Sequence, residues 1–154
     1  MEVKKLNESF YDENKHLVEV MDKNGSNWNG HKTRGYGIVL VESGELTFGI
    51  PLRSNMRHPY GFITAPSENK GLDYSKAVLL KKEEYISDAE FIIPQPEYIC
   101  IKENSEKIAK EFNKYVKNYM RGVRNEDDRI LRNYRFSTLQ NYRKELGGAG
   151  ADEG

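Results

Sequence analysis

The stretch Tyr36–Leu52, YGIVLVESGELTFGIPL, decides the fold of this chain. Two apolar runs, Tyr36–Val41 and Leu46–Leu52, flank the short polar segment Glu42–Glu45, which contains a glycine. Runs rich in β-branched and aromatic residues on both sides of such a segment predict a β-hairpin. Because hairpin strands are antiparallel, the start of the first strand must lie beside the end of the second. The chain before residue 36 and the chain after residue 52 are therefore expected to meet at one end of a sheet.

Further elements are expected on both sides of this hairpin. Short strands are predicted at Val3–Leu6, Tyr60–Thr64, Ala77–Leu80 and Glu90–Ile93, with a short helix from Asn7 to about Lys15 and an exposed polar loop over Lys23–Arg34. After Pro96 the apolar residues recur with helical period from Ile108 to Val123, which predicts a helix of about five turns with Asn104 as its N-cap.

Two more helices are expected near the C-terminus. Asn125 is the predicted N-cap of one, with Ile130, Leu131 and Tyr134 facing inward. Ser137 and Gln140 are interpreted as a capping box of the other, whose inward residues would be Leu139, Tyr142 and Leu146 and whose stop would be Gly147. The predicted fold class is α+β, a small, strongly bent antiparallel β-sheet or barrel with C-terminal helices. Residues 1–146 form one domain, and the tail 147–154 is expected to be disordered.

Composition limits the class of protein. A chain of 154 residues suits one domain, and its ten tyrosines, six phenylalanines and one tryptophan argue against disorder. No apolar run approaches the roughly 20 residues that span a bilayer. Cys100 is the single cysteine, which excludes a disulfide framework or a zinc cluster of cysteines. We expect a soluble cytoplasmic protein with no membrane partner.

The net charge of zero hides an uneven distribution. The 24 basic residues balance the 24 acidic ones, but segments 29–59 and 107–144 are basic, whereas 1–28 and 60–103 are acidic. Two basic blocks could form one cationic face on a neutral molecule. The alternative is that these lysines and arginines only solvate helix surfaces.

Several enzyme classes lack their signatures. The chain has no P-loop, no GxGxxG that opens a helix, no GxSxG and no HExxH. It also has no D-x-D cluster that would hold Mg²⁺, so no metal and no cofactor are expected.

Chemistry-bearing residues concentrate in two loops, GHKTRG (30–35) and RSNMRH (53–58), which the hairpin should bring together. The expected cluster contains two histidines, several cations and small polar side chains: His31, Lys32, Thr33, Arg34, Tyr36, Arg53, Ser54, Asn55, Arg57 and His58. Such a set suits a phosphodiester, because cations bind the nonbridging oxygens and histidine moves protons near neutral pH. RNA cleavage to a 2′,3′-cyclic phosphate and a 5′-hydroxyl needs little else. The alternatives are a basic cluster that binds phosphate without catalysis and histidines that are ordinary surface residues, as is expected for His16.

The hairpin residues resemble a known family. The sequences TRGYGIVL (33–40) and FGIPLRS (48–54) are similar to the hairpin of the type III toxin–antitoxin ribonuclease toxins, the ToxN/AbiQ/CptN group. In that group the first strand contains Gly-Ile/Val followed by two aliphatic residues. The second ends in Ala-Pro-Leu-Ser/Thr-Ser-Pro-Lys. The order of strands followed by basic helices is also similar, so the resemblance covers about residues 1–146.

The resemblance implies a compact bent barrel of the MazF/Kid-like type and a metal-independent, sequence-selective endoribonuclease. It further implies inhibition by a small structured antitoxin RNA, which the toxin cuts from a repeat transcript and binds in a closed multi-subunit protein–RNA assembly. Cellular or phage RNA would be the substrate. Ser54 would match the active-site serine, Arg53 the neighbouring Ser/Thr, and Lys32–Arg34 the basic residue before the first strand.

This chain departs from the family pattern after the serine, where Asn55-Met56 replaces Pro-Lys. Ser54 is therefore expected to orient the phosphate or the 2′-hydroxyl. The phosphorane would be stabilised by Lys32, Arg53 and Arg57. Protons would be transferred by His31 or His58. Thr33, Arg34, Tyr36 and Asn55 are expected to bind RNA.

A second RNA-binding surface is expected on the long helix. Cations at three- and four-residue spacing would line the face opposite its apolar stripe: Lys107, Lys110, Lys114, Lys117, Arg121 and Arg124. A structured RNA could lie along this face. The alternative for this helix is a face that is only solvated. For the protein as a whole, the alternatives to a ribonuclease are a non-catalytic RNA- or DNA-binding module and, in a different class, a protein-interaction adaptor.

Overall fold

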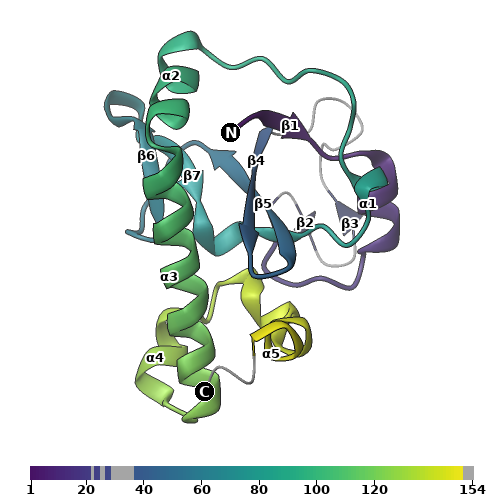
Figure 1. Ribbon diagram of the computed structural model, residues 1–154, viewed down its shortest axis with the longest axis vertical. Coiled ribbons are helices and arrows are strands. Elements are labelled where there is room, and N and C mark those ends of the chain that lie inside the picture. Colours follow the sequence, from purple (N-terminus) through teal and green to yellow (C-terminus); the bar gives the residue numbers. More distant parts are fainter. Residues whose placement is uncertain (22, 25–26, 29–36, 151–154) are drawn as a thin grey trace.

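The computed structural model describes residues 1–21, 23–24, 27–28 and 37–150 (Figure 1). It confirms the α+β class. The strands are β1 (Val3–Lys5), β2 (Lys23–Asn24), β3 (Asn27–Trp28), β4 (Gly37–Ser43), β5 (Leu46–Arg53), β6 (Gly61–Ala65), β7 (Lys70–Asp73) and β8 (Val78–Leu79). The α-helices are α1 (Glu8–Glu13), α2 (Gln95–Glu103), α3 (Ser105–Arg124), α4 (Asp128–Asn133) and α5 (Arg143–Gly150). Short 3₁₀ turns are η1 (Pro66–Glu68), η2 (Tyr74–Lys76), η3 (Glu83–Tyr85) and η4 (Thr138–Asn141).

The predicted hairpin is present as β4 and β5. Their register runs from Ser43 opposite Leu46 to Ile38 opposite Pro51. The turn is two residues long, and Gly44 at its first position has a φ of 61°. A positive φ at this position alone is typical of a type II′ turn, which glycine adopts without steric cost. The hairpin therefore forms where the sequence predicts it.

The sheet is open, so the expectation of a closed barrel is wrong. Six antiparallel strands follow the order β1-β4-β5-β7-β6, with β8 also paired to β5. β1 and β6 end this order and do not pair with each other in the part of the chain that the structure describes. With strands of two to eight residues in this order, the sheet does not close on itself. β2 and β3 form a separate two-stranded ribbon within the segment predicted to be a loop.

One edge of β5 pairs with two short strands in succession, β7 and β8, which are separated by the turn η2. Leu72 lies opposite Leu52, but Val78 lies opposite Gly49, so the chain between them contains extra residues. These residues form η2, which interrupts the ladder between β7 and β8. Such an interruption re-aims side chains, as a β-bulge does. Asp73, the last residue of β7, lies one position past the Leu72–Leu52 pair, and Ser75 of η2 bonds its carboxylate.

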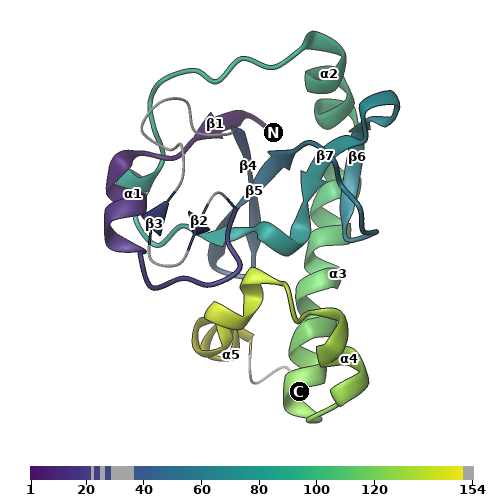
Figure 2. The same ribbon diagram turned by 180° about the vertical axis from the view of Figure 1, so that it is seen from behind.

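α3 is the predicted long helix and packs along the sheet (Figures 1 and 2). Five residues of its predicted apolar stripe are buried, each at most 7% exposed: Ile108, Phe112, Tyr115, Val116 and Tyr119. The sixth, Val123, is only half-buried, and Met120 is buried as well. The Phe112 ring meets Phe48 of β5 edge-on, with ring centroids 5.3 Å apart. α4 and α5 lie at one end of the molecule and α2 at the other (Figure 1).

Several predicted boundaries differ from the structure. No strand forms at residues 90–93, where the chain is irregular. Asp127, and not Asn125, caps α4, because its carboxylate accepts the backbone N–H groups of residues 129 and 130. Ser137 caps η4, and α5 continues past the predicted stop at Gly147 to Gly150. Residues 151–154 of the expected tail lie outside the described residues.

The predicted inward residues of the C-terminal helices are confirmed in most cases. Tyr134, Leu139, Tyr142 and Leu146 are buried, whereas Ile130 and Leu131 are half-buried. In the described residues no helix combines the length and the apolar character needed to cross a membrane.

Candidate active site

The segment 53–58 leaves the sheet at the end of β5 and is held by a single buried side chain. Arg53 still pairs with Gly71 of β7. Ser54 and Asn55 are exposed, and Asn55 has a φ of 56°, a left-handed conformation that asparagine tolerates. Met56 is only 4% exposed, and its backbone is bonded to Asn69 on both sides, through its N–H and its carbonyl. Met56 thus anchors the loop and leaves its neighbours at the surface.

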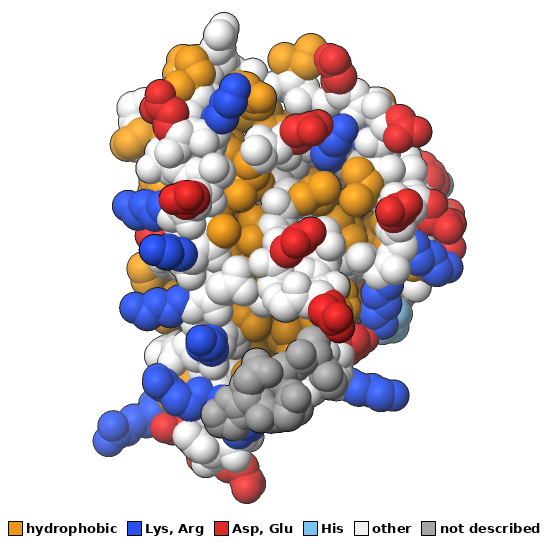
Figure 3. All heavy atoms as spheres, viewed as in Figure 1, with side chains coloured by type: hydrophobic (Ala, Val, Ile, Leu, Met, Phe, Trp, Pro, Cys, Tyr) orange, Lys and Arg blue, Asp and Glu red, His pale blue; other side chains and the backbone are white. Residues whose placement is uncertain are grey.

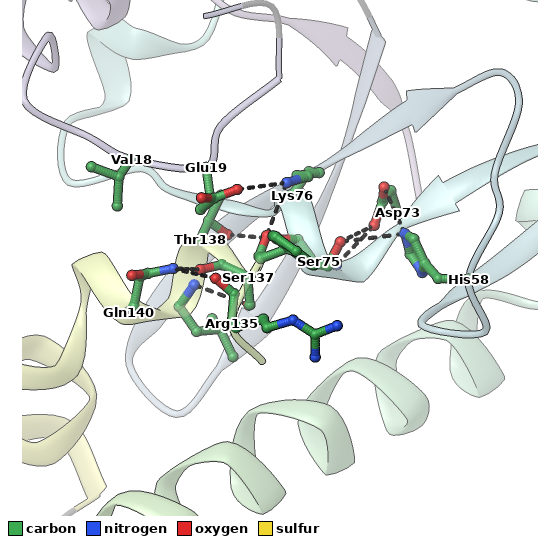
Figure 4. Close-up of polar contacts among 12 residues, drawn as sticks. Val18, Glu19, His58, Asp73, Ser75, Lys76, Arg135, Ser137, Thr138 and Gln140 are labelled. Atoms are coloured by element: carbon green, nitrogen blue, oxygen red, sulfur yellow. Dashed lines mark hydrogen bonds and ion pairs between the residues drawn. The ribbon is translucent and has the colours of Figure 1, made fainter. Parts of the chain in front are cut away.

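Asp73 lies at the centre of a polar cluster that the loop joins (Figure 4). Its side chain is 0% exposed. Oδ2 accepts Nη1 of Arg53 at 2.8 Å and lies 3.2 Å from Nε2 of His58. Oδ1 accepts the backbone N–H of Ser75 at 3.0 Å and its hydroxyl at 2.6 Å. Four donors fill the acceptor sites of an ionised carboxylate, so the buried group is fully satisfied.

The contacts of His58 fix which ring nitrogen carries the proton. Nδ1 accepts the backbone N–H of Tyr60 at 3.0 Å, so it is unprotonated in this arrangement. The proton is then on Nε2, which donates to Asp73 and lies 3.4 Å from the hydroxyl of Ser75. Both nitrogens are therefore engaged by the protein. His58 can exchange a proton with a substrate only after one of these bonds opens.

Arg53 presents the rest of its guanidinium to solvent. The side chain is 36% exposed, and Asp73 binds one of its nitrogens. A guanidinium has five N–H donors, and among the residues that the structure describes Asp73 alone binds the Arg53 guanidinium, which leaves further donors to meet an anion. The ion pair with Asp73 fixes the orientation of this planar donor. The nearby Ser54 and Arg57 are also exposed.

A column of tyrosines continues from His58 towards the C-terminal helices. The Tyr60 ring stacks on the His58 ring at 5.6 Å and on Tyr134 at 6.4 Å. Tyr134 in turn lies 4.7 Å from the Tyr115 ring of α3 and donates its hydroxyl to the Tyr115 carbonyl. Burial raises the pKa of both Tyr115 and Tyr134, so their phenols stay protonated. These packed rings support the site on the side of His58.

Lys76 of η2 is turned away from this cluster. Its Nζ donates to the carbonyl of Phe136 at 2.9 Å and pairs with Glu19 at 3.7 Å. Burial lowers the pKa of Lys76, and the nearby carboxylates of Glu19 and Asp73 oppose that shift. The lysine joins η2 to the chain before η4.

The sequence did not predict Asp73, Ser75, Tyr60 or Lys76 as site residues, and the expected cluster held no carboxylate. A signal was present: Asp73 two residues before Ser75 can form a turn in which the aspartate accepts the backbone N–H two positions later. What the sequence lacks is the register of β7 against β5. The pairing of Gly71 with Arg53 and of Leu72 with Leu52 brings this turn to the end of β5.

Five predicted site residues lie outside the described residues: His31, Lys32, Thr33, Arg34 and Tyr36. The structure places Gly37, the next residue, one position beyond the pair of Ile38 with Pro51. Segment 30–36 therefore connects to the end of the sheet where Arg53 lies. That the two loops form one pocket stays a prediction.

The predicted cations of α3 are all exposed: Lys107, Lys110, Lys114, Lys117, Arg121 and Arg124. Figure 3 shows basic side chains along the edge of the molecule that α3 forms. Lys107 lies 5.9 Å from the ring centroid of Phe62 on β6, and Arg121 bonds Asn118. The predicted basic face of the helix is therefore present. That this face binds RNA stays a prediction.

Among the residues that the structure describes, no group of three or more His, Cys, Asp or Glu side chains could hold a metal ion. Comparison of the whole chain with protein-family models found no match. Comparisons with curated proteins and with solved structures likewise found no protein to which the chain is similar.

Proposed function

We propose that this protein is a metal-independent endoribonuclease toxin of the type III toxin–antitoxin class, with its active site at the end of β5. The observation that carries the proposal is the Arg53–Asp73 ion pair beside the exposed Ser54. A cation fixed by a buried carboxylate, with a hydroxyl next to it at the surface, is a preorganised receptor for a phosphodiester. The resemblance of the hairpin residues to the ToxN/AbiQ/CptN group supports the same assignment.

In the proposed reaction the ribose 2′-oxygen attacks the adjacent phosphorus. The 2′-hydroxyl proton passes to a base, the bond from phosphorus to the 5′-oxygen breaks, and an acid gives that oxygen a proton. The products are a 2′,3′-cyclic phosphate and a 5′-hydroxyl. Arg53 and Arg57 stabilise the charge that develops on the nonbridging oxygens, and Ser54 donates a hydrogen bond to one of them.

The proton carriers are the next part of the proposal. Because both nitrogens of His58 are engaged, we assign His58 with Asp73 to the positioning of Arg53. Direct proton transfer then falls to His31 of the preceding loop, and Lys32 joins Arg53 and Arg57 in stabilising the phosphorane. His58 could take part only if its bond to Tyr60 or its bond to Asp73 opened during the reaction.

The proposal includes the partner RNA and the wider fold relationship. A small structured antitoxin RNA would lie on the basic face of α3, within a closed assembly of several protein and RNA subunits. Relationship to the MazF/Kid-like toxins is proposed for the bent sheet and its covering helices, without a closed barrel.

The first test is cleavage of a mixed RNA by the purified protein in EDTA, followed by analysis of the ends. The account expects cleavage in the chelator, with cyclic phosphate and 5′-hydroxyl ends. A requirement for added Mg²⁺, or the appearance of 3′-hydroxyl ends, would refute the mechanism.

The engaged His58 favours one alternative, a non-catalytic RNA- or DNA-binding module that uses the same basic surfaces. Replacing Ser54 with Ala separates the two. A toxin loses growth inhibition and keeps binding of its antitoxin RNA, because Ser54 is exposed and makes no side-chain hydrogen bond among the described residues. A binding module has no toxicity to lose.

A further inference from the structure

Phe136 is an exposed aromatic ring on a rigidly held backbone. It lies in the connection between α4 and η4 and is 59% exposed, whereas Tyr134 and Ser137 on either side are 4% and 1% exposed. The N–H of Ser137 bonds the carbonyl of Tyr134, which closes a tight turn around the phenylalanine. Because Tyr134 and Ser137 are buried and hold the backbone on both sides of Phe136, its ring cannot turn into the core. It stays presented to solvent.

A cation covers part of this ring. The guanidinium carbon of Arg135 lies 4.7 Å from the centroid of the Phe136 ring, within the range of a cation–π contact. Nη1 of Arg135 donates to the carbonyl of Arg132 at 2.8 Å, which fixes the guanidinium in place. Phe136 therefore presents a flat apolar surface beside a fixed positive charge.

Two hydrogen bonds attach this segment to the candidate active site. Lys76 Nζ donates to the carbonyl of Phe136 at 2.9 Å, and the hydroxyl of Thr138 donates to the carbonyl of Ser75 at 3.2 Å. Ser75 is itself bonded to Asp73. Figure 4 shows Arg135 on the side of η2 where Ser75 and His58 lie, with its guanidinium extended away from η4. The aromatic surface and the Asp73 cluster thus share one supporting turn.

We propose that Phe136, with the Arg135 guanidinium over its ring, is a stacking platform for one unpaired base of an RNA strand held at the Arg53–Asp73 site. Every base has a flat π face that an aromatic side chain can cover, and an arginine beside the ring strengthens the attraction. Base stacking on exposed rings is the usual way in which proteins hold single-stranded RNA. The inference rests on the proposed function in one respect, that the ligand is RNA.

The charge around the platform suits a nucleic acid. Arg129 and Arg132 of α4 are exposed, as is Arg135 itself. Phenylalanine and arginine are also enriched at protein interfaces, so the choice of RNA as the ligand rests on the proposed function. A base on Phe136 places its own phosphates near these arginines.

The test is equilibrium binding of a fluorescent 12-nucleotide 2′-O-methyl RNA of mixed sequence, which cannot be cleaved by 2′-hydroxyl attack. Wild type is compared with Phe136→Ala, Phe136→Trp and the control Ile92→Ala, another exposed apolar residue, 85% exposed. Loss of one base–aromatic stack should weaken binding by about 5- to 150-fold in Phe136→Ala. Phe136→Trp should restore most of it, and Ile92→Ala should bind as wild type does.

Abasic sites placed at each position of the same RNA identify the stacked base. At one position the abasic site should weaken binding to wild type as much as Phe136→Ala does and have no further effect on that variant. The inference is overturned if Phe136→Ala binds as wild type does, if the loss depends on no single position, or if wild type does not bind the RNA at all. Because the probe is not cleaved, a chain that stacks this base but cuts no RNA would refute the nuclease proposal alone.

Discussion

Replacing Asp73 with asparagine should destabilise the fold and disorder the site together. The amide has the shape of the carboxylate, so no cavity forms. The asparagine amide, however, has one acceptor oxygen where the carboxylate has two. Its NH₂ group, which is itself a donor, must therefore face two other donors. Those donors are either Arg53 with His58, or the N–H and hydroxyl of Ser75.

The size of the effect follows from the exposure of the partners. Removing one member of a fully buried ion pair costs about 3–5 kcal/mol. Arg53 and His58 are 36% and 26% exposed, so water compensates part of the loss. We expect Asp73→Asn to lower the free energy of unfolding by about 2–3 kcal/mol, and the melting temperature by roughly 4–12 °C for a domain of this size.

Urea unfolding at pH 7, followed by circular dichroism, measures this change. Asp88→Asn is the matched control, because Asp88 is exposed, and it should stay within about 0.5 kcal/mol of wild type. Ser75→Ala, which removes one of the four donors, should cost about 1 kcal/mol. If Asp73→Asn is as stable as Asp88→Asn, the carboxylate does not organise this cluster and the reasoning fails. RNA cleavage should fall about 100-fold in Asp73→Asn, because Arg53 loses its fixed orientation.

Three further predictions test other parts of the structure. Gly71→Ala should prevent stable folding or lower the free energy of unfolding by at least about 3 kcal/mol. The Cβ of the new alanine would meet the Phe62 carbonyl oxygen of the paired strand β6. Normal thermal unfolding of this variant would contradict the β6–β7 register. Lys81→Met should cost about 0.5 kcal/mol at pH 7, because Lys81 holds the pKa of the Glu145 carboxyl below its ordinary value of 4.5. A depressed carboxyl pKa stabilises the fold above the unfolded-state pKa, so this cost should shrink as the pH falls from 4.5 through the lowered folded-state pKa of Glu145. A cost that is equal at pH 3 and pH 7 would point to a different cause. The triple substitution Lys110→Gln, Lys114→Gln and Lys117→Gln removes three cations from the basic face of α3. It should make the plot of log RNA affinity against log salt concentration less steep, by an amount that corresponds to up to about three phosphate contacts. An unchanged slope would show that RNA binds elsewhere.

The elements with strong patterns were predicted from the sequence. The β4–β5 hairpin has two apolar runs and a glycine turn, and α3 has an apolar stripe from Ile108 to Val123, so local residues alone specify them. The boundary at Asp127 was missed because Asn125, Asp127 and Asp128 are all good caps, and only tertiary packing selects one.

The part of the site that was missed depends on contacts between distant residues. β7 is short and has glycine at its second position, so its pattern does not indicate a strand. Asp73 becomes a site residue because β7 pairs with β5 so that Gly71 lies opposite Arg53, and this register is not written in either segment alone. Arg53 and Ser54 could be identified because they directly follow the hairpin.

Single-turnover RNA cleavage in EDTA by Arg53→Ala measures whether Arg53 stabilises the transition state, the step on which the proposed mechanism depends. Lys102→Ala, which removes an exposed cation of α2, is the control, and Arg53→Lys retains a charge for Asp73 without the planar donor. We expect a rate about 100- to 1000-fold below wild type for Arg53→Ala, with Lys102→Ala unchanged. A folded Arg53→Ala variant that cleaves RNA at the wild-type rate would contradict the mechanism.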